Sequence, residues 1–232
     1  MKTQTRNESA RRGRILPQRF YARDPRIVAR ELLGKVLVRT LSDRAPELAG
    51  RIVEVEAYLG EDDAAAHSAA GETARNRVLF GPPGHAYIYF IYGVHFCLNF
   101  SCLPEGQAGC VLLRALEPVS GIEEMAKARR IDPARLQSPS GLKLLTSGPG
   151  RLCEALSITR SALNGAALYL PDSGLRIVED AFRPPEIGES PRVGITKSSA
   201  LPLRYFIAGN KFVSGRSNVK ARLADLTQDL SS

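Results

Sequence analysis

Alternating apolar and polar positions predict a β-strand over residues 50–59. Two sets of side chains alternate there, with Val53, Val55 and Ala57 on one side and Glu54, Glu56 and Tyr58 on the other. Successive side chains of a strand point to opposite faces, so one face is apolar and the other carries two carboxylates and a phenol. Similar patterns predict strands at roughly 35–40, 110–115, 165–180 and 191–213, with a Pro-rich link at 183–185.

A strongly aromatic segment at 86–101 predicts a β-hairpin. A three-residue loop of Tyr92, Gly93 and Val94 keeps its two faces consistent. The apolar face then carries Ile88, Phe90, Phe96 and Leu98, and the second face carries Tyr87, Tyr89, His95 and Asn99. We expect the second face to line a pocket. The tip exposes Tyr92 and Val94, and apolar wedges of this kind enter the minor groove and unstack bases; packing against the chain's own core or a partner is the alternative.

Three helices are indicated by their end signals. The first has Asp24 as its cap, Pro25 in its first turn and Gly34 as its stop. Its apolar side is formed by Ile27, Val28, Leu32 and Leu33. The second covers 121–130, and the third follows 146–151 and runs through residue 156.

Arginines near two loops are expected to contact phosphates. The segment 146–151 leaves free backbone N–H groups near a helix start, which is a plausible phosphate cradle beside Arg151. A loop at 61–84 carries Arg75 and Arg77. For Arg151, a solvated surface charge is an equal alternative.

Composition points to a polyanionic partner. The 232 residues are 44% hydrophobic, which can supply a sizeable core. Lys and Arg outnumber Asp and Glu by 32 to 24, a formal charge of +8, which favours a polyanionic partner such as nucleic acid or an anionic membrane surface. On charge alone, a solvated basic surface is an equal alternative. No apolar run approaches the ~20 residues that span a bilayer, and no secretory signal is present. We expect a soluble protein that is not exported.

The chain's ends and its cysteines limit the architecture. Residues 1–14 read as a disordered basic arm, and 217–232 as a polar tail, around a single α+β domain at 15–216. The four cysteines lie among apolar residues without a CxxC pair: Cys97, Cys102, Cys110 and Cys153. Buried free thiols are therefore expected, and neither a metal site nor another cofactor is.

The order of several motifs resembles that of the alkyladenine (3-methyladenine) DNA glycosylase family. The motifs are Gly50–Gly60, His67-Ser68, Arg75-Asn76-Arg77, Tyr89–Asn99, Val111–Pro118, Ser147-Gly148-Pro149 and Arg192-Val193-Gly194. They span about residues 16–215 and are specific only together. The resemblance implies a compact monomer with a curved, partly open, barrel-like antiparallel sheet, surrounding helices and a protruding hairpin. His95 departs from the family, whose members often have Tyr there.

The resemblance also implies the catalytic groups. Glu56 matches the general base, and the carbonyl of Val193 and the side chain of Arg114 match groups that hold the attacking water. From the residues alone, Glu56 reads more simply as a solvated or salt-bridged strand residue, and Arg114 as a partner of Glu54 or Glu117.

Base recognition follows in the same way. Tyr58, His67 and Tyr89 match residues that hold the flipped base. Asn99 matches the residue that crowds the exocyclic amine of guanine. Tyr92 matches the side chain that fills the gap left in the duplex. His67 as a structural histidine is the alternative. Because alkylated purines carry positive charge, electron-rich rings favour them by about 0.5 to 2 kcal/mol.

Together these features predict a base-excision repair enzyme acting on double-stranded DNA. We expect it to excise 3-methyladenine, 7-methylguanine and, by extension, ethenoadenine and hypoxanthine, leaving an abasic site without strand cleavage. We expect it in the cytoplasm, associated with the nucleoid, or in the nucleus if the organism is a eukaryote. A neutral leaving purine needs a proton, and no second acid is evident.

Three other functions fit the sequence less well. A non-catalytic damaged-DNA-binding protein would have no reason to keep Glu56, Arg114 and Tyr58 in their family places. A zinc-dependent base deaminase needs H-x-E and P-C-x-x-C motifs, which are absent. An endonuclease needs carboxylates for Mg²⁺, for which only Glu54 and Glu56 are candidates.

Overall fold

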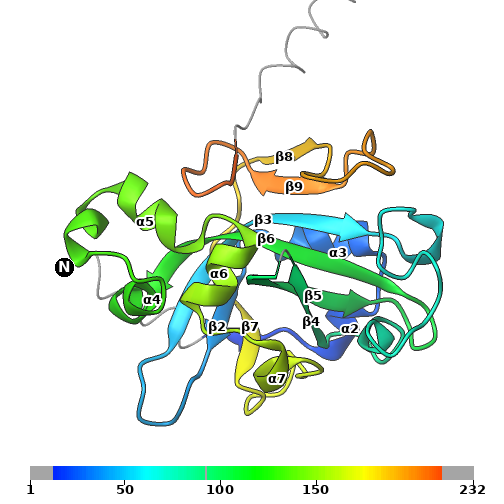
Figure 1. The fold of residues 1–232 in the computed structure, drawn as a ribbon, viewed down its shortest axis with the longest axis horizontal. Coiled ribbons are helices and arrows are strands. Elements are labelled where there is room, and N and C mark those ends of the chain that lie inside the picture. The colour runs from blue at the N-terminus through cyan, green and yellow to red at the C-terminus, as the bar shows by residue number, and fades with distance from the viewer. Residues whose placement is uncertain (1–12, 92, 216–232) are drawn as a thin grey trace, which may run out of the picture.

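One antiparallel sheet organises the chain, as Figure 1 shows for the computed structural model, which describes residues 13–91 and 93–215. Its strands are β1 (Arg14–Ile15), β2 (Val36–Arg39), β3 (Leu48–Tyr58), β4 (Ala86–Ile91), β5 (His95–Cys102), β6 (Gly109–Ser120), β7 (Leu175–Glu179), β8 (Ile187–Ser190) and β9 (Arg204–Ile207). Their order is β1-β7-β2-β3-β6-β5-β4, and β9 pairs with both β3 and β8. The predicted α+β class with a single curved antiparallel sheet is confirmed.

Short helices cover this sheet. They are α2 (Gln18–Tyr21), α3 (Pro25–Leu32), α4 (Ile122–Ala128), α5 (Pro139–Thr146), α6 (Pro149–Ala155) and α7 (Arg160–Leu163), with 3-10 turns η1 (Gly60–Asp62), η2 (Arg77–Leu79) and η3 (Pro133–Gln137). The core forms where α3 packs on β3 and β6, and where α6 packs on β5 and β6. Asp24 caps α3 as predicted, accepting from the Arg26 N–H at 2.8 Å. Ile27, however, is 47% exposed and does not belong to the apolar side.

The 11-residue strand β3 lies between other strands along most of its length. It pairs with β6 on one edge, while β2 and then β9 occupy the other edge (Figure 1). The β3–β6 register shifts on both sides of Glu54. Because bulges bend and twist a strand, the shifts curve the sheet where the two carboxylates of β3 lie.

The hairpin of β4 and β5 has the register that its two faces predicted. Ile91 opposes His95, which leaves a three-residue connection at 92–94, and Tyr87 opposes Asn99 further along the same face. Side chains alternate across each strand, so the aromatic face is directed as a unit toward one side of the sheet. The position of Tyr92 lies outside the described residues.

Two of the predicted strands were too long. Residues 165–174 form turns instead, because Gly165 and Leu168 donate backbone hydrogen bonds to the start of the hairpin, and the strand begins only at Leu175. In the region 191–213 only Arg204–Ile207 is a strand, and β8 precedes that region. Pro191, directly after β8, has no N–H for a sheet ladder. A long loop therefore separates β8 from β9.

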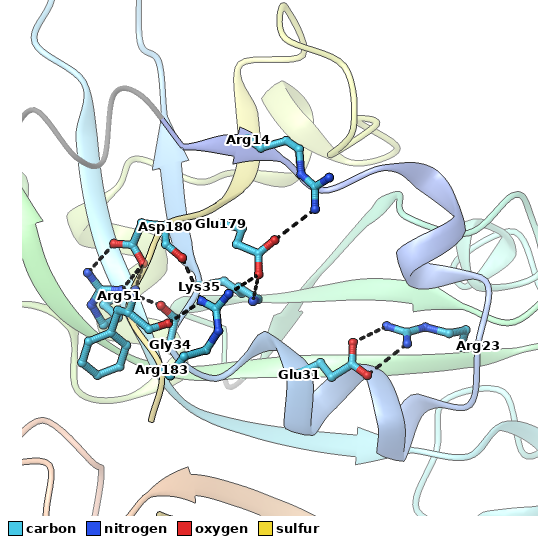
Figure 2. A network of polar contacts seen from close by, with 10 residues as sticks. Arg14, Arg23, Glu31, Gly34, Lys35, Arg51, Glu179, Asp180 and Arg183 are labelled. Carbon is cyan, nitrogen blue, oxygen red and sulfur yellow. Dashed lines mark hydrogen bonds and ion pairs between the residues drawn. The ribbon is translucent and has the colours of Figure 1, made fainter. Parts of the chain in front are cut away.

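Ion pairs attach the first described strand to the sheet. Arg14 and Lys35 both contact the Glu179 carboxylate, at 3.2 and 2.7 Å, and Arg51 binds Asp180 nearby (Figure 2). Arg14 was predicted to lie in a disordered arm, but pairing of β1 with β7 places it in the domain. Residues 1–12 of that arm and the tail at 217–232 lie outside the described residues. Within the described part, no helix is long and apolar enough to span a membrane.

Candidate active site

Glu56 is a fully buried carboxylate on the bent part of β3. Its Oε1 atom accepts the N–H of Val193 at 2.7 Å and lies 3.1 Å from Nη1 of Arg114. Its Oε2 atom accepts the hydroxyl of Tyr58 at 3.1 Å. A carboxylate offers about four acceptor positions. The contacts from described residues therefore leave one position on Oε2 for a further donor such as water.

Arg114 joins Glu56 to the second carboxylate of β3. Its Nε atom lies 3.0 Å from Glu54, which also accepts from Arg204 at 2.7 Å and from the Ser214 hydroxyl at 2.9 Å. Burial alone would lower the pKa of Arg114, but the carboxylates of Glu56 and Glu54 hold that pKa above its ordinary value. Arg114 therefore forms the ion pair with Glu54 that was considered as an alternative, and it contacts Glu56 at the same time.

Glu117, the other partner considered for Arg114, lies elsewhere in the polar network. Its carboxylate accepts from the side chain of Asn210 at 3.1 Å. The two buried carboxylates of β3 are instead balanced by two guanidiniums, those of Arg114 and Arg204. A charge-balanced cluster of this kind is held in one geometry by its hydrogen bonds.

A small aromatic cavity of about 130 Å³ adjoins Tyr58. Its lining is Tyr58, Ala65, His67, Leu79, Tyr87, Tyr89, Asn99, Cys110 and Ile195. The four residues predicted for the base pocket, Tyr58, His67, Tyr89 and Asn99, are all among them. They come from β3, the loop after it, and both strands of the hairpin. Sheet topology thus brings distant parts of the sequence to one hollow.

The rings of the cavity pack edge-on and face-on. The His67 and Tyr89 centroids lie 4.3 Å apart in a T-shaped contact, and Tyr87 stacks on Tyr89 at 5.6 Å. Nδ1 of His67 lies 3.1 Å from the Tyr87 hydroxyl. Desolvation, and then the nearby charge of Arg75, lower the pKa of His67 below 6.5. The imidazole is therefore neutral at pH 7.

Asn99 is fixed by contacts at both ends of its amide. Its Nδ2 donates to the carbonyl of Tyr87 at 3.3 Å, and the Cys110 thiol donates to its Oδ1 at 3.8 Å. Burial raises the pKa of Cys110 to about 12, so the thiol keeps its proton. The four cysteines are buried and free, as predicted. Cys110 lines the cavity, which no pattern in the sequence indicates.

The loop that carries His67 is held by one buried side chain. Asn76 donates through Nδ2 to the carbonyls of His67 and Gly71, at 2.9 and 3.0 Å, and accepts from Thr73 through Oδ1. The loop begins at Gly60, whose φ is +89° and where a Cβ would lie 1.8 Å from the carbonyl oxygen of Ala108. Only glycine fits there.

A second buried ion pair lies beside Tyr58. Arg192 binds both carboxylate oxygens of Asp63, and both side chains are 0% exposed. The guanidinium carbon lies 4.5 Å from the centroid of the Tyr58 ring, and Nη1 donates to the carbonyl of Ala57 at 3.1 Å. Burial alone would raise the pKa of Asp63, but its hydrogen bonds with Arg192 lower it. Asp63 was missed because a lone Asp in a loop has no distinguishing pattern.

The residues proposed to meet DNA phosphates lie on the surface. Arg75, Arg77 and Arg151 are exposed. The first donates to the carbonyl of Phe90 at 3.4 Å, which places it beside the hairpin, and Arg77 pairs with Glu72. At the hairpin tip Val94 is 66% exposed.

The backbone cradle expected beside Arg151 is partly occupied. The N–H of Gly148 donates to the carbonyl of Arg114 at 3.0 Å, so it is not free for a phosphate. The guanidinium of Arg151 itself donates to the carbonyl of Ser147 at 3.4 Å. Within the described ranges, no group of three or more His, Cys, Asp and Glu side chains is arranged to hold a metal ion.

Comparison with known proteins gives consistent matches. The chain matches the family model "Methylpurine-DNA glycosylase (MPG)" over residues 19–211. A Koribacter versatilis protein named "Putative 3-methyladenine DNA glycosylase" is 63% identical over 201 residues, covering 87% of this chain and 93% of that protein. Proteins of the same name from Burkholderia cenocepacia and Methanoculleus marisnigri are 44% and 47% identical, covering 88% and 87% of this chain and 92% and 99% of their own lengths.

Proposed function

The chain belongs to the methylpurine-DNA glycosylase family of DNA-repair enzymes, and from this premise we propose that it excises damaged purines from duplex DNA. The substrates would be 3-methyladenine, 7-methylguanine, 1,N6-ethenoadenine and hypoxanthine. The observation that carries the proposal is a buried carboxylate, Glu56, which is linked by a hydrogen bond to Tyr58 in the wall of an aromatic cavity.

Glu56 is the proposed general base. It takes a proton from water through the remaining acceptor position of Oε2, while the water oxygen attacks C1′ of the sugar. The C1′–N bond breaks, and its electron pair leaves with the purine. The negative charge of Glu56 also stabilises the oxocarbenium-like sugar of the transition state. Arg114 and the N–H of Val193 hold the carboxylate in place. The carbonyl of Val193 and the Arg114 side chain are proposed to hold the water.

The cavity is the proposed site of the flipped base. Tyr58, Tyr89 and His67 offer aromatic faces and edges, and a cationic purine gains about 0.5 to 2 kcal/mol from such rings. His67 is uncharged at pH 7, so it does not repel a cationic base. Asn99 is proposed to exclude normal guanine by crowding its exocyclic amine.

The hairpin tip is proposed to occupy the space that the flipped base leaves. The exposure of Val94 supports this role, which we also propose for Tyr92. Arg75, Arg77 and Arg151 would then contact phosphates on either side. Among the described residues that line the cavity there is no lysine, which favours hydrolysis over Schiff-base strand cleavage. We propose that the enzyme acts as a monomer in the cytoplasm, on nucleoid DNA.

Duplex oligonucleotides with a single hypoxanthine or ethenoadenine test this function. The protein is incubated with them in EDTA, and abasic sites are revealed as strand breaks after hot alkali. We expect breaks only after alkali treatment. Breaks without alkali would overturn the monofunctional mechanism. Tight binding of damaged DNA without any abasic sites would instead identify a non-catalytic damaged-DNA-binding protein.

A further inference from the structure

The Arg192–Asp63 ion pair lies next to the ring that the flipped base is proposed to contact. The guanidinium carbon of Arg192 is 4.5 Å from the Tyr58 centroid and completely shielded from solvent. A guanidinium over a ring occupies one of its two faces. Only the other face or the edge of Tyr58 is left to line the cavity.

Stability gives little reason for this arrangement. Removing two charges from water is costly, and a buried pair regains that cost only with complete hydrogen bonding. Nε of Arg192 is buried and has no hydrogen-bond partner among the described residues. An apolar pair of similar size would fill the same space without that penalty. Because stability does not account for the Arg192–Asp63 pair, we look for its role in the neighbouring cavity.

The charge of Arg192 changes what Tyr58 offers to a ligand. The ring attracts cations through the negative potential of its faces. A guanidinium on one face uses part of that attraction, and it also repels a second cation across the thickness of the ring. The carboxylate of Asp63 binds Arg192 from 2.8 Å and so offsets part of the repulsion.

We propose that the buried Arg192–Asp63 pair determines specificity by setting how strongly Tyr58 prefers cationic purines over neutral ones. Arg192 weakens the preference for cations, and Asp63 limits that weakening. The pair thus lets one cavity accept both alkylated, charged bases and deaminated, neutral ones. This inference rests on the proposed function.

The test compares single-turnover excision of 7-methylguanine, in slightly acidic buffer where it is cationic, with excision of hypoxanthine, which is neutral. The ratio of the two rates is the readout, because a purely structural defect lowers both rates together. Arg192→Gln/Asp63→Asn removes both charges and should raise the ratio at least about threefold. Asp63→Asn alone leaves Arg192 uncompensated and should lower the ratio. Arg192→Lys keeps the charge and should leave the ratio close to wild type.

A matched control is available on β3, the strand that carries Tyr58. Arg51 binds Asp180 (Figure 2), and its guanidinium carbon lies 4.3 Å from the centroid of the Phe182 ring. None of these three residues lines the aromatic cavity. Arg51→Gln/Asp180→Asn should leave the ratio unchanged.

The possible results distinguish a failure of this inference from a failure of the proposed glycosylase function. Equal ratios in wild type, Arg192→Gln/Asp63→Asn and Asp63→Asn would overturn the inference while leaving the function standing. The two variants are predicted to shift the ratio in opposite directions, so either one tests the inference if the other does not fold. If wild type excises neither base, the function fails first and the inference falls with it.

Discussion

The hydroxyl of Tyr58 donates a 3.1 Å hydrogen bond to Glu56. One side chain thus contacts the proposed base and lines the cavity for the flipped purine. Burial, followed by the charge of Glu56, raises the pKa of Tyr58, so the phenol stays protonated and can donate. A base that enters the cavity therefore lies against a residue that also orients the carboxylate.

Tyr58→Phe should separate these two roles. The ring is kept, but Glu56 loses a donor worth about 1 kcal/mol. We expect single-turnover excision to slow roughly fivefold, with affinity for damaged DNA nearly unchanged. The rate and the affinity are measured on the same oligonucleotide. A loss of affinity with an unchanged rate would show that the hydroxyl contributes to DNA binding and not to the orientation of the Glu56 carboxylate.

Arg114→Met should destabilise the fold. It leaves Glu54 and Glu56 buried with less positive charge, and removing one partner of a buried ion pair costs about 3 to 5 kcal/mol. Urea denaturation measures the free energy of unfolding. Glu54→Gln added to this variant should recover part of the loss. A change below about 1 kcal/mol in Arg114→Met would contradict the described ion-pair network.

Protonation of His67 should disfavour cationic substrates. Its pKa lies below 6.5 in the folded protein, so the ring gains a proton only as the pH falls through that lowered value. The charge then repels a cationic base, and the ratio of 7-methylguanine to hypoxanthine excision should decline with falling pH. His67→Gln should remove the decline; the same decline in that variant would rule out His67 as its source.

The lowered pKa of His67 also makes the stability of the fold depend on pH. The unfolded chain takes up the proton near pH 6.5, before the folded chain does. The contribution of His67 to stability is therefore fully present above that pH and is lost as the pH falls toward the lowered folded pKa. Wild type should lose more stability than His67→Gln in this window, measured by urea unfolding at several pH values.

Val94→Asp should weaken binding to DNA without changing the fold. Val94 is 66% exposed at the hairpin tip, so a carboxylate there meets water in the free protein and phosphates or bases in the complex. We expect affinity for duplex DNA to fall about tenfold, a loss of roughly 1.4 kcal/mol. Leu170→Asp is the matched control, since Leu170 is also an exposed apolar residue, at 50%. Equal losses in the two variants would indicate a general charge effect rather than a contact by the tip.

Local patterns predicted the elements whose signals lie within a few residues. The period-two alternation gave β3, and the two faces of the hairpin fixed its loop length, because a register slip would have mixed apolar and polar side chains. The segments 165–174 and 191–203 were assigned to strands because apolar residues recur in them. The backbone of residues 165–168 bonds to residues 84–86 and does not pair in a ladder with a neighbouring strand. A pattern of apolar residues does not show which backbone groups will pair.

The surroundings of the site depend on contacts between distant positions. Glu54 is bound by Arg204, 150 residues away, and Asp63 by Arg192, 129 residues away. The sequence placed Glu56 on a polar face and the family resemblance suggested its role, but its complete burial follows only from strands on both sides of β3. Partner choice across a sheet is set by topology, not by local spacing.

The role of Glu56 is tested most directly by Glu56→Gln. The amide has nearly the same shape and can still accept the N–H of Val193, but it cannot take a proton from water. The measurement is the single-turnover rate of abasic-site formation on a hypoxanthine duplex, with the affinity determined on the same DNA. We predict affinity within about twofold of wild type and a rate lower by at least about 10²-fold. A rate within about threefold of wild type would contradict the assignment of Glu56 as the general base.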